Sequence, residues 1–240
     1  ALDKVIQITE RDHYGYSEML THVPILTHGK IKKVLIIGGG DGAIAAEVLK
    51  YPEIEEISIC EIDKEVINLS RLYLKTINKG SLIHSKVNVI IKDASKLITQ
   101  KDLTNYFDLV IADRPDPTGP GKNLFQIKFY QDIKNVLSET GIAVFQNGVP
   151  FFQEKELRET NKYLKKTFML SGTYLTVVPT YIGGYMALTW ASKKTDMSKN
   201  INTNKKLDIG EKLNTKYYTN EIHRSSFILP NWIKNILLPK

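Results

Sequence analysis

Acidic residues follow several of the apolar, strand-like runs of this sequence. Asp113 and Asp116 stand three residues apart in a Pro- and Gly-rich turn after the run 107–112, and Asp41 follows the run 34–37. Asp and Pro also favour purely structural turns. Two carboxylates facing one cavity would attract a cation, and one could accept a proton from an ammonium group that becomes a nucleophile. A metal site is the alternative, but the five histidines lie elsewhere, at no ligand-like spacing to these acids.

A glycine-rich segment, 38–42, joins a predicted strand to a predicted helix. Its glycines let the backbone approach a ligand closely, or they form a tight turn with no ligand. Glu61 ends the next strand, 23 residues after Gly38, at a spacing that suits ribose hydroxyls. Asp93 ends the third strand, where it could meet an adenine amino group or cap the following helix. Because Asp41 would repel a pyrophosphate but suit an ammonium group, an S-adenosylmethionine-like ligand is favoured over NAD.

Alternating apolar runs and helical patterns would position these residues. Strands are predicted at 34–37, 57–62, 87–91, 107–112, 142–145, 173–178 and 186–191. Helices are predicted at 43–49, 65–77, 94–100, 125–137 and 154–168. The second helix carries apolar residues on one face at spacings of three and four, namely Val66, Leu69, Leu72 and Tyr73. The pattern predicts an α/β fold: a mostly parallel sheet covered on both faces, with an antiparallel edge hairpin and ligands at the carboxyl ends of its strands.

Composition excludes several classes of protein. The chain has 240 residues, of which 42% are hydrophobic, so it is not a disordered protein and suits one domain with a short appendage. No apolar run approaches the roughly 20 residues that span a bilayer. The first residues lack the zones of a secretory signal, and a single Cys60 forms neither an intrachain disulfide nor a cysteine-rich zinc site. We expect a soluble, cytoplasmic protein that binds no membrane.

The positive charge is concentrated near the end of the chain. The formal net charge is +7, and the segment 193–240 contains ten basic and four acidic residues, so the preceding residues nearly balance. The lysines of this segment are scattered, without the interleaved aromatic residues that single-strand binders use. A solvated polar surface is therefore favoured over a nucleic-acid site.

Seven motifs in order give a more specific indication. They are L-D-x-V-I-Q-x-T-E-R-D at 2–12, Y-x-E-M-L-T-H-V-P at 16–24, V-L-I-I-G-G-G-D-G at 34–42, E-I-D at 61–63, D-x-x-D-P-x-G-P at 113–120, Q-N-G at 146–148 and P-T-Y at 179–181. With these motifs the chain resembles the spermidine synthases, aminopropyltransferases of polyamine biosynthesis, over nearly its whole length and most closely the bacterial members.

The resemblance implies a Rossmann-like fold of the S-adenosylmethionine-methyltransferase type. It also implies transfer of an aminopropyl group from decarboxylated S-adenosylmethionine to an amine, normally putrescine, which yields spermidine and methylthioadenosine. The donor is a co-substrate, so the resemblance implies neither a cofactor nor a metal. It further implies three segments, which are a remnant of an N-terminal region (a strand plus a helix) at 1–30, a Rossmann-like catalytic domain at 31–192, and a basic linker with a C-terminal packing segment at 193–240.

The resemblance implies a role for each matching residue. Asp113 would be the base that deprotonates the amine. The acceptor amine would contact Tyr16, Ser17, Asp116, Gln146 and Tyr181. The donor would contact Gln7, Gly38, Gly40, Asp41, Glu61, Asp93, Ala94 and Pro120. Within the donor site, Asp41 would bind the aminopropyl ammonium, Glu61 the ribose, and Asp93 with Ala94 the adenine.

Three departures from the family pattern bear on activity. Arg114 lies between the paired acids, where relatives have small hydroxyl residues; its permanent charge would repel a diammonium if it pointed inward and be harmless if it pointed outward. Ser17 stands where relatives carry His or Gln. The chain begins inside the family pattern, without the N-terminal β-strand segment that helps relatives to oligomerise, so the expected homodimer or homotetramer would be weakened.

Other functions remain open on the sequence alone. The enzyme could use a different amine acceptor, or it could be a methyltransferase that uses intact S-adenosylmethionine. Asp41 and the acidic pair argue against the methyltransferase, because they leave no evident place for a donor carboxylate. A catalytically dead homologue that only binds methylthioadenosine is the alternative from another class.

Overall fold

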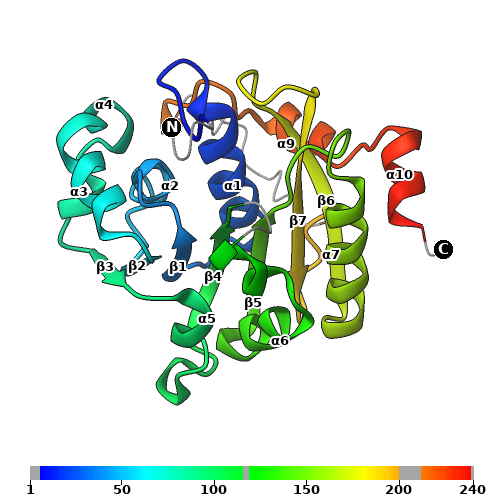
Figure 1. Ribbon diagram of the computed structural model, residues 1–240, viewed down its shortest axis with the longest axis horizontal. Helices are drawn as coiled ribbons and strands as arrows, with labels where there is room; N and C mark the ends of the chain where they lie inside the picture. Colours follow the sequence, from blue (N-terminus) through cyan, green and yellow to red (C-terminus); the bar gives the residue numbers. More distant parts are fainter. Residues whose placement is uncertain (1–5, 116–118, 200–211, 239–240) are drawn as a thin grey trace.

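The computed structural model describes residues 6–115, 119–199 and 212–238, and these residues form a seven-stranded sheet (Figure 1). The strands are β1 (Lys33–Gly38), β2 (Glu56–Glu61), β3 (Val87–Ile91), β4 (Phe107–Asp113), β5 (Leu137–Gln146), β6 (Leu170–Val177) and β7 (Tyr185–Ser192). Their order is β3-β2-β1-β4-β5-β7-β6. The first five strands pair in parallel, and β7 is antiparallel to both β5 and β6. The predicted mostly parallel α/β fold with an antiparallel edge hairpin is confirmed.

Helices cover both faces of the sheet. They are α1 (His13–His28), α2 (Ala43–Val48), α3 (Lys64–Tyr73), α4 (Lys75–Asn78), α5 (Ala94–Leu97), α6 (Ile127–Val136), α7 (Glu154–Thr167), α9 (Asn220–Ser226) and α10 (Asn231–Leu237). Short 3-10 helices lie at η1 (Ser81–Ile83), η2 (Lys101–Leu103) and η3 (Gly119–Phe125). Helices α1, α2 and α3 pack on one face and α5, α6 and α7 on the other.

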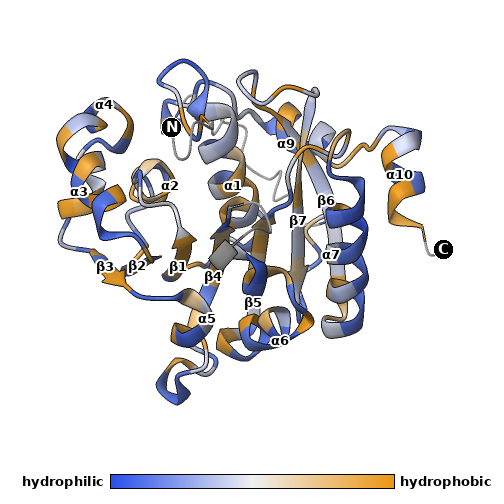
Figure 2. Cartoon of the chain, in the orientation of Figure 1, coloured by the Kyte–Doolittle hydropathy of each residue, from blue (hydrophilic) through white to orange (hydrophobic). Residues whose placement is uncertain are grey.

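The apolar strand runs supply the two cores between these layers. In β1, Val34 and Ile36 belong to the core beneath α1 and α2, whereas Leu35 and Ile37 belong to the core beneath α5 and α6. All four side chains are buried, because successive residues of a strand point to opposite faces. Figure 2 shows hydrophobic residues along β1 and β3, and helices such as α6 and α7 that carry both hydrophobic and hydrophilic residues. A sheet buried on both faces explains why its strands are continuous apolar runs.

Two elements differ from the prediction. The helix predicted at 65–77 is divided into α3 and α4 at Leu74, whose φ of −105° and ψ of 33° lie outside the helical range. The side chains of Leu69, Leu72 and Tyr73 are exposed, and Ile67 contacts the core instead. Periodicity therefore identified the helix but not the face that packs.

Strand β5 begins at Leu137, directly after α6, rather than after a turn near Gly141. Its pairing with β4 has a register irregularity between Phe107 and Leu109, which accommodates the early start. Gly141 lies within the strand, where an added Cβ would stand 3.1 Å from the carbonyl oxygen of Phe107. The glycine therefore permits a close strand approach instead of ending an element.

The C-terminal part of the chain packs on the helices that cover the sheet. The buried carboxylate of Glu18 in α1 accepts backbone N–H groups from Lys216, Tyr217 and Tyr218, each at 2.8 Å. Helix α10 packs against α7 through a small apolar cluster. The division of the chain at residues 30 and 192 stays a prediction. Within the part that the structure describes, no helix has the length and apolar character needed to cross a membrane.

Candidate active site

The predicted acids gather because three parallel strands end side by side. Strand β1 pairs with β2 on one side and with β4 on the other, and Gly38 lies directly opposite Asp113. Asp41 follows β1, Glu61 ends β2 and Asp113 ends β4. The charges of Asp41 and Glu61 both raise the pKa of Asp113, so the three carboxyl groups act on one another.

The glycines after β1 permit this close approach. Gly38 has a φ of +76°, and a Cβ added there would stand 2.1 Å from the carbonyl oxygen of Asp113. A Cβ at Gly40 would stand 2.9 Å from Oε2 of Glu61. Any larger residue would push β4 or the Glu61 carboxyl aside, so the strand ends can meet only with glycine at these positions.

Asp113 accepts a hydrogen bond from a tyrosine of helix α1, which packs on the sheet. The hydroxyl of Tyr16, on α1, donates to Oδ1 of Asp113 at 2.5 Å. Burial and the neighbouring charge of Asp41 raise the pKa of Asp113 to about 7, although the Tyr16 hydrogen bond opposes that rise. Burial and Asp113 raise the pKa of Tyr16 well above its usual value, so its phenol keeps its proton. Asp113 is therefore a carboxyl group that can exchange a proton near neutral pH.

Asp41 and Glu61 are held by backbone donors. Oδ1 of Asp41 accepts the N–H of Ala43 at 2.7 Å, and Oε1 of Glu61 accepts the N–H of Asp63 at 3.0 Å. Burial raises the pKa of both carboxyl groups, and backbone hydrogen bonds oppose the rise. Among the described residues, no Lys or Arg forms an ion pair with Asp41, Glu61 or Asp113. A cationic ligand would relieve this repulsion.

Asp93 and Ala94 lie one strand further along the same edge. Asp93 Oδ1 accepts the backbone N–H of Ser95 at 2.9 Å and its hydroxyl at 2.7 Å, so Asp93 caps α5. Ala94, the first residue of α5, is buried. Lys92, just before them, donates its N–H to the carbonyl of Glu61 at 3.0 Å, which places this segment beside the Glu61 end of β2.

Hydrogen bonds connect the segment before α1 to the loop after β6. The hydroxyl of Tyr181 donates to the carbonyl of Gln7 at 2.6 Å, and the N–H of Thr180 donates to Oδ2 of Asp12 at 2.7 Å. Tyr181 also raises the pKa of Tyr16, so these residues lie near the Asp113 end of the site. The structure thus brings Gln7, Tyr16 and Tyr181 together.

Asp12 has a structural role that the sequence pattern did not predict. Burial alone would raise the pKa of Asp12, but hydrogen bonds from Thr180 and Thr9 hold it below its usual value. Its carboxylate therefore ties the segment before α1 to the loop after β6. The only sequence signal was that Asp12 and Thr180 both lie within motifs that carry the family resemblance.

Other predicted residues lie at the margin of this site. The buried hydroxyl of Ser17 donates back to the carbonyl of His13 at 3.0 Å, along α1. Gln146 ends β5, next to the Ala112 end of β4. The backbone of Pro120 lies in η3, and Asp116 lies outside the described residues. Arg114 is buried and turns away from the acids, because its hydrogen-bond partners include Tyr130 of α6.

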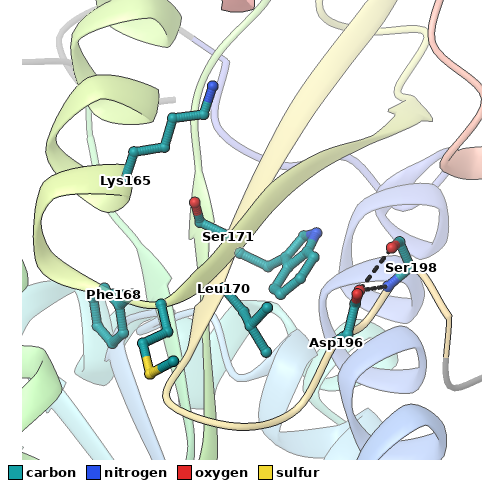
Figure 3. Close-up of a pocket in the computed structure, with 8 residues that line it drawn as sticks. Lys165, Phe168, Leu170, Ser171, Asp196 and Ser198 are labelled. Carbon is teal, nitrogen blue, oxygen red and sulfur yellow. Dashed lines mark hydrogen bonds between the residues drawn. The ribbon is translucent and has the colours of Figure 1, made fainter.

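A separate cavity of about 280 Å³ lies beside the β6–β7 hairpin (Figure 3). It is lined by Lys165, Phe168, Met169, Leu170, Ser171, Trp190, Asp196 and Ser198. None of the predicted site residues lines it, and its charged groups already have partners: Lys165 donates to the Leu237 carbonyl and Asp196 accepts from Ser198. Elsewhere among the described side chains, no group of three or more His, Cys, Asp or Glu is arranged to hold a metal ion. The acidic strand ends therefore remain the candidate site.

Comparisons with known proteins point to the same chemistry. Residues 13–204 match the family described as "Spermine/spermidine synthase domain". The polyamine aminopropyltransferase of Ruegeria sp. (strain TM1040) is 43% identical over 98% of this chain and 82% of its own length. That of Buchnera aphidicola subsp. Acyrthosiphon pisum (strain Tuc7) is 46% identical, with the same two coverages of 98% and 82%.

Two solved spermidine synthases have backbones similar to that of this chain. A spermidine synthase in complex with the transition state analogue AdoDATO superimposes with a TM-score of 0.89 at 36% identity, covering 99% of this chain and 80% of that chain. The spermidine synthase from Thermotoga maritima superimposes with a TM-score of 0.87 at 35% identity, covering 99% and 79%.

Proposed function

Because the chain belongs to the spermine/spermidine synthase family, we propose that it transfers the aminopropyl group of decarboxylated S-adenosylmethionine to putrescine, with Asp113 as the base. The products are spermidine and methylthioadenosine. The contact that carries the proposal is the hydrogen bond from Tyr16 to Asp113 among the half-buried acids at the strand ends. A methyltransferase or a binding-only homologue has no comparable support from these relatives.

The deprotonation of the acceptor amine is a step that Asp113 is suited to perform. An alkylammonium has a pKa near ~10, so putrescine must lose a proton before its nitrogen can attack. The pKa of Asp113 is raised to about 7, closer to that of the amine than an ordinary carboxylate would be. A smaller difference between the two pKa values makes the proton transfer less unfavourable.

The substitution itself needs mainly orientation. The neutral amine nitrogen attacks the aminopropyl carbon bonded to the sulfonium sulfur, the new C–N bond forms, and the C–S bond breaks. The electron pair of the C–S bond neutralises the sulfonium, so methylthioadenosine leaves without charge. The proton taken from the amine passes to Asp113 and then to water. Holding both substrates in line for this attack supplies most of the catalysis.

The donor would occupy the β1–β3 end of the site. We assign the aminopropyl ammonium to Asp41, the ribose hydroxyls to Glu61 and the adenine to the segment Asp93–Ala94. Gly38 and Gly40 leave room for the donor, and Gln7 and Pro120 border it. Half-buried carboxylates without a cationic partner among the described residues favour a donor that carries both a sulfonium and an ammonium charge.

The acceptor would lie between Tyr16, Asp113 and Tyr181, with Gln146 and Asp116 at its margins. Ser17 is the weakest of the proposed contacts, because its hydroxyl already donates to the His13 carbonyl. Arg114 presents no charge to this space, since its guanidinium is buried on the other side of β4. A dicationic acceptor is therefore compatible with the site. The cytoplasmic location and an oligomeric state stay predictions.

A direct assay tests the proposal. The purified chain, given decarboxylated S-adenosylmethionine and a panel of putrescine, cadaverine, diaminopropane, agmatine and spermidine, should form methylthioadenosine and the aminopropylated amine, with putrescine preferred. Asp113→Asn should lower turnover about 100-fold or more while methylthioadenosine still binds. Turnover with intact S-adenosylmethionine but not with its decarboxylated form would overturn the reaction, and near-normal turnover of Asp113→Asn would overturn the base.

A further inference from the structure

Arg114 is a buried cation next to the proposed base, on the opposite side of the strand end. Its side chain is 2% exposed. Asp113 faces Tyr16 of α1, whereas Arg114 reaches α6 and α7 in the other layer. Successive residues at a strand end point to opposite faces, so the arrangement follows from the backbone of β4. Arg114 and Asp113 are therefore connected through adjacent backbone, while their side chains lie on opposite sides of the sheet.

Each N–H donor of the guanidinium has an acceptor. A guanidinium has five such donors in a planar fork. The acceptors are the carbonyl oxygens of Gln146 (3.2 Å from Nε) and Leu124 (2.5 Å from Nη1), the hydroxyls of Tyr130 (2.8 Å from Nη1) and Thr160 (3.3 Å from Nη2), and Oδ1 of Asn147 (3.2 Å from Nη2). These groups come from the end of β5, from η3, and from α6 and α7. One side chain thus joins four elements to the end of β4.

The guanidinium of Arg114 is surrounded by neutral polar and aromatic groups. Its guanidinium carbon lies 3.8 Å from the ring centroid of Phe125, the last residue of η3. Among the described residues, none of the carboxylates forms an ion pair with it. A buried charge of this kind is tolerated only when its hydrogen bonds are complete. The fork geometry is therefore essential, and a lysine, with three donors on one atom, would not reproduce it.

We propose that Arg114 is a positioning residue of the aminopropyl transfer, whose guanidinium fixes the end of β4 so that the Asp113 carboxyl stands at the correct place in the site. The proposal rests on the proposed function. Gly38 packs against the carbonyl of Asp113 from the β1 side. On the β5 side, the guanidinium of Arg114, the next residue, donates to the carbonyl of Gln146. The backbone at the end of β4 is thus held from both sides. A displacement of about 1 Å at a reacting group can lower a rate about 100-fold, so this restraint bears directly on turnover.

Conservative variants test the positioning role. Arg114→Lys keeps the charge and Arg114→Met keeps most of the volume. Both should lower kcat about 10- to 100-fold, while the Kd for methylthioadenosine stays within about threefold of the wild-type value. Both should move the acidic limb of the pH–rate profile upward, because a displaced Asp113 loses part of its hydrogen bond from Tyr16. The order of preferred acceptors should not change, since Arg114 does not face the acceptor.

A milder pair of variants covers the case in which these proteins do not fold. Tyr130→Phe removes one acceptor from the guanidinium, whereas Tyr163→Phe alters a ring that contacts Tyr130 and has no hydrogen bond to Arg114. Tyr130→Phe should lower kcat about three- to tenfold. It should also speed amide hydrogen exchange in residues 119–125, and Tyr163→Phe should match the wild type in both measurements.

The outcomes separate this proposal from the proposed function. Wild-type kcat and pH profile in Arg114→Lys, or in Tyr130→Phe if Arg114 variants do not fold, would overturn the positioning role. An equal loss of methylthioadenosine affinity would also overturn it, because it would indicate general disruption. If the wild type itself transfers no aminopropyl group, the proposed function fails. The titration of the Asp113 carboxyl, followed by ¹³C NMR in Tyr130→Phe, then shows whether the guanidinium network controls that carboxyl.

Discussion

The hydrogen bond from Tyr16 to Asp113 predicts a specific change in pH dependence. The Tyr16 hydroxyl donates to the Asp113 carboxyl, so it stabilises the ionised form and lowers the pKa of Asp113 below the value that burial alone would produce. Tyr16→Phe removes this donor and keeps the ring. The pKa of Asp113 should therefore rise from the value of about 7 found with Tyr16 present.

The size of the change follows from the strength of the bond. A hydrogen bond to a charged group contributes about 1.5–3 kcal/mol. Because the Asp113 carboxyl is only partly buried, we take the lower end of this range. At about 1.4 kcal/mol for each tenfold change, the pKa of Asp113 should move to about 8. The ionised fraction at pH 7 then falls from about one half to about one tenth, so kcat should fall about fivefold at pH 7 and recover above about pH 9.

Two measurements check this reasoning. The Asp113 carboxyl can be titrated by ¹³C NMR in the free protein, and the pH–kcat profile can be recorded with saturating substrates. Tyr181→Phe is the matched control for the titration, because its hydroxyl donates to the Gln7 carbonyl. An unchanged or lower pKa of Asp113 in Tyr16→Phe would refute the reasoning. A loss of activity that is equal at every pH would also refute it, because Tyr16 would then act only on acceptor packing.

Three further predictions concern stability and substrate binding. Asp113→Asn should raise the free energy of unfolding by roughly 4 kcal/mol at pH 8, because a pKa raised from 3.8 to about 7 corresponds to about 1.4 kcal/mol for each unit. The gain should vanish below about pH 4. The raised pKa means that the folded wild type binds more protons than the unfolded chain, so its stability falls as pH rises through 4 to 7. Urea titrations at both pH values check this, and equal midpoints would contradict it. Gly38→Ala should cost roughly 2–4 kcal/mol because its Cβ would meet the Asp113 carbonyl at 2.1 Å, whereas Gly80→Ala, at a similar positive φ in open space, should cost about 1–2 kcal/mol. Equal losses would show that φ alone matters. Asp12→Ala should raise the KM for putrescine about fivefold with little change in methylthioadenosine binding, because the loop bearing Tyr181 loses its anchor at Thr180. An unaltered KM in steady-state assays would separate that loop from the acceptor site.

Much of the fold was predictable because it depends on local pattern. Continuous apolar runs such as 34–37 are typical of strands in a sheet that is buried on both faces, and the strands all appear near their predicted positions. The phase of α3 was not predictable in this way. Its apolar residues at three- and four-residue spacing suggested a packed face, but Leu72 is exposed and Ile67 is buried. Which side of a helix packs depends on where the chain enters and leaves it.

The candidate site was also only partly predictable from the sequence. Asp41, Glu61 and Asp113 could be selected from the sequence, because parallel strands end at one edge and each acid follows a strand. The partner of each acid could not be selected. Tyr16 lies 97 residues from Asp113 along the chain, and only the packing of α1 on the sheet brings them together. Asp116 lies outside the described residues, so its role stays a prediction.

The direction of Arg114 shows most clearly what the sequence leaves open. The order of motifs determined the family, the parallel sheet and the gathering of acids at its edge, because these follow from strand polarity and from residue types at fixed spacing. Only the tertiary structure decided that Arg114 turns to α6 and α7 and that the pKa of Asp113 lies near neutrality. Both depend on burial and on distances between residues that are remote in the sequence, and only the packing of helices on the sheet sets these.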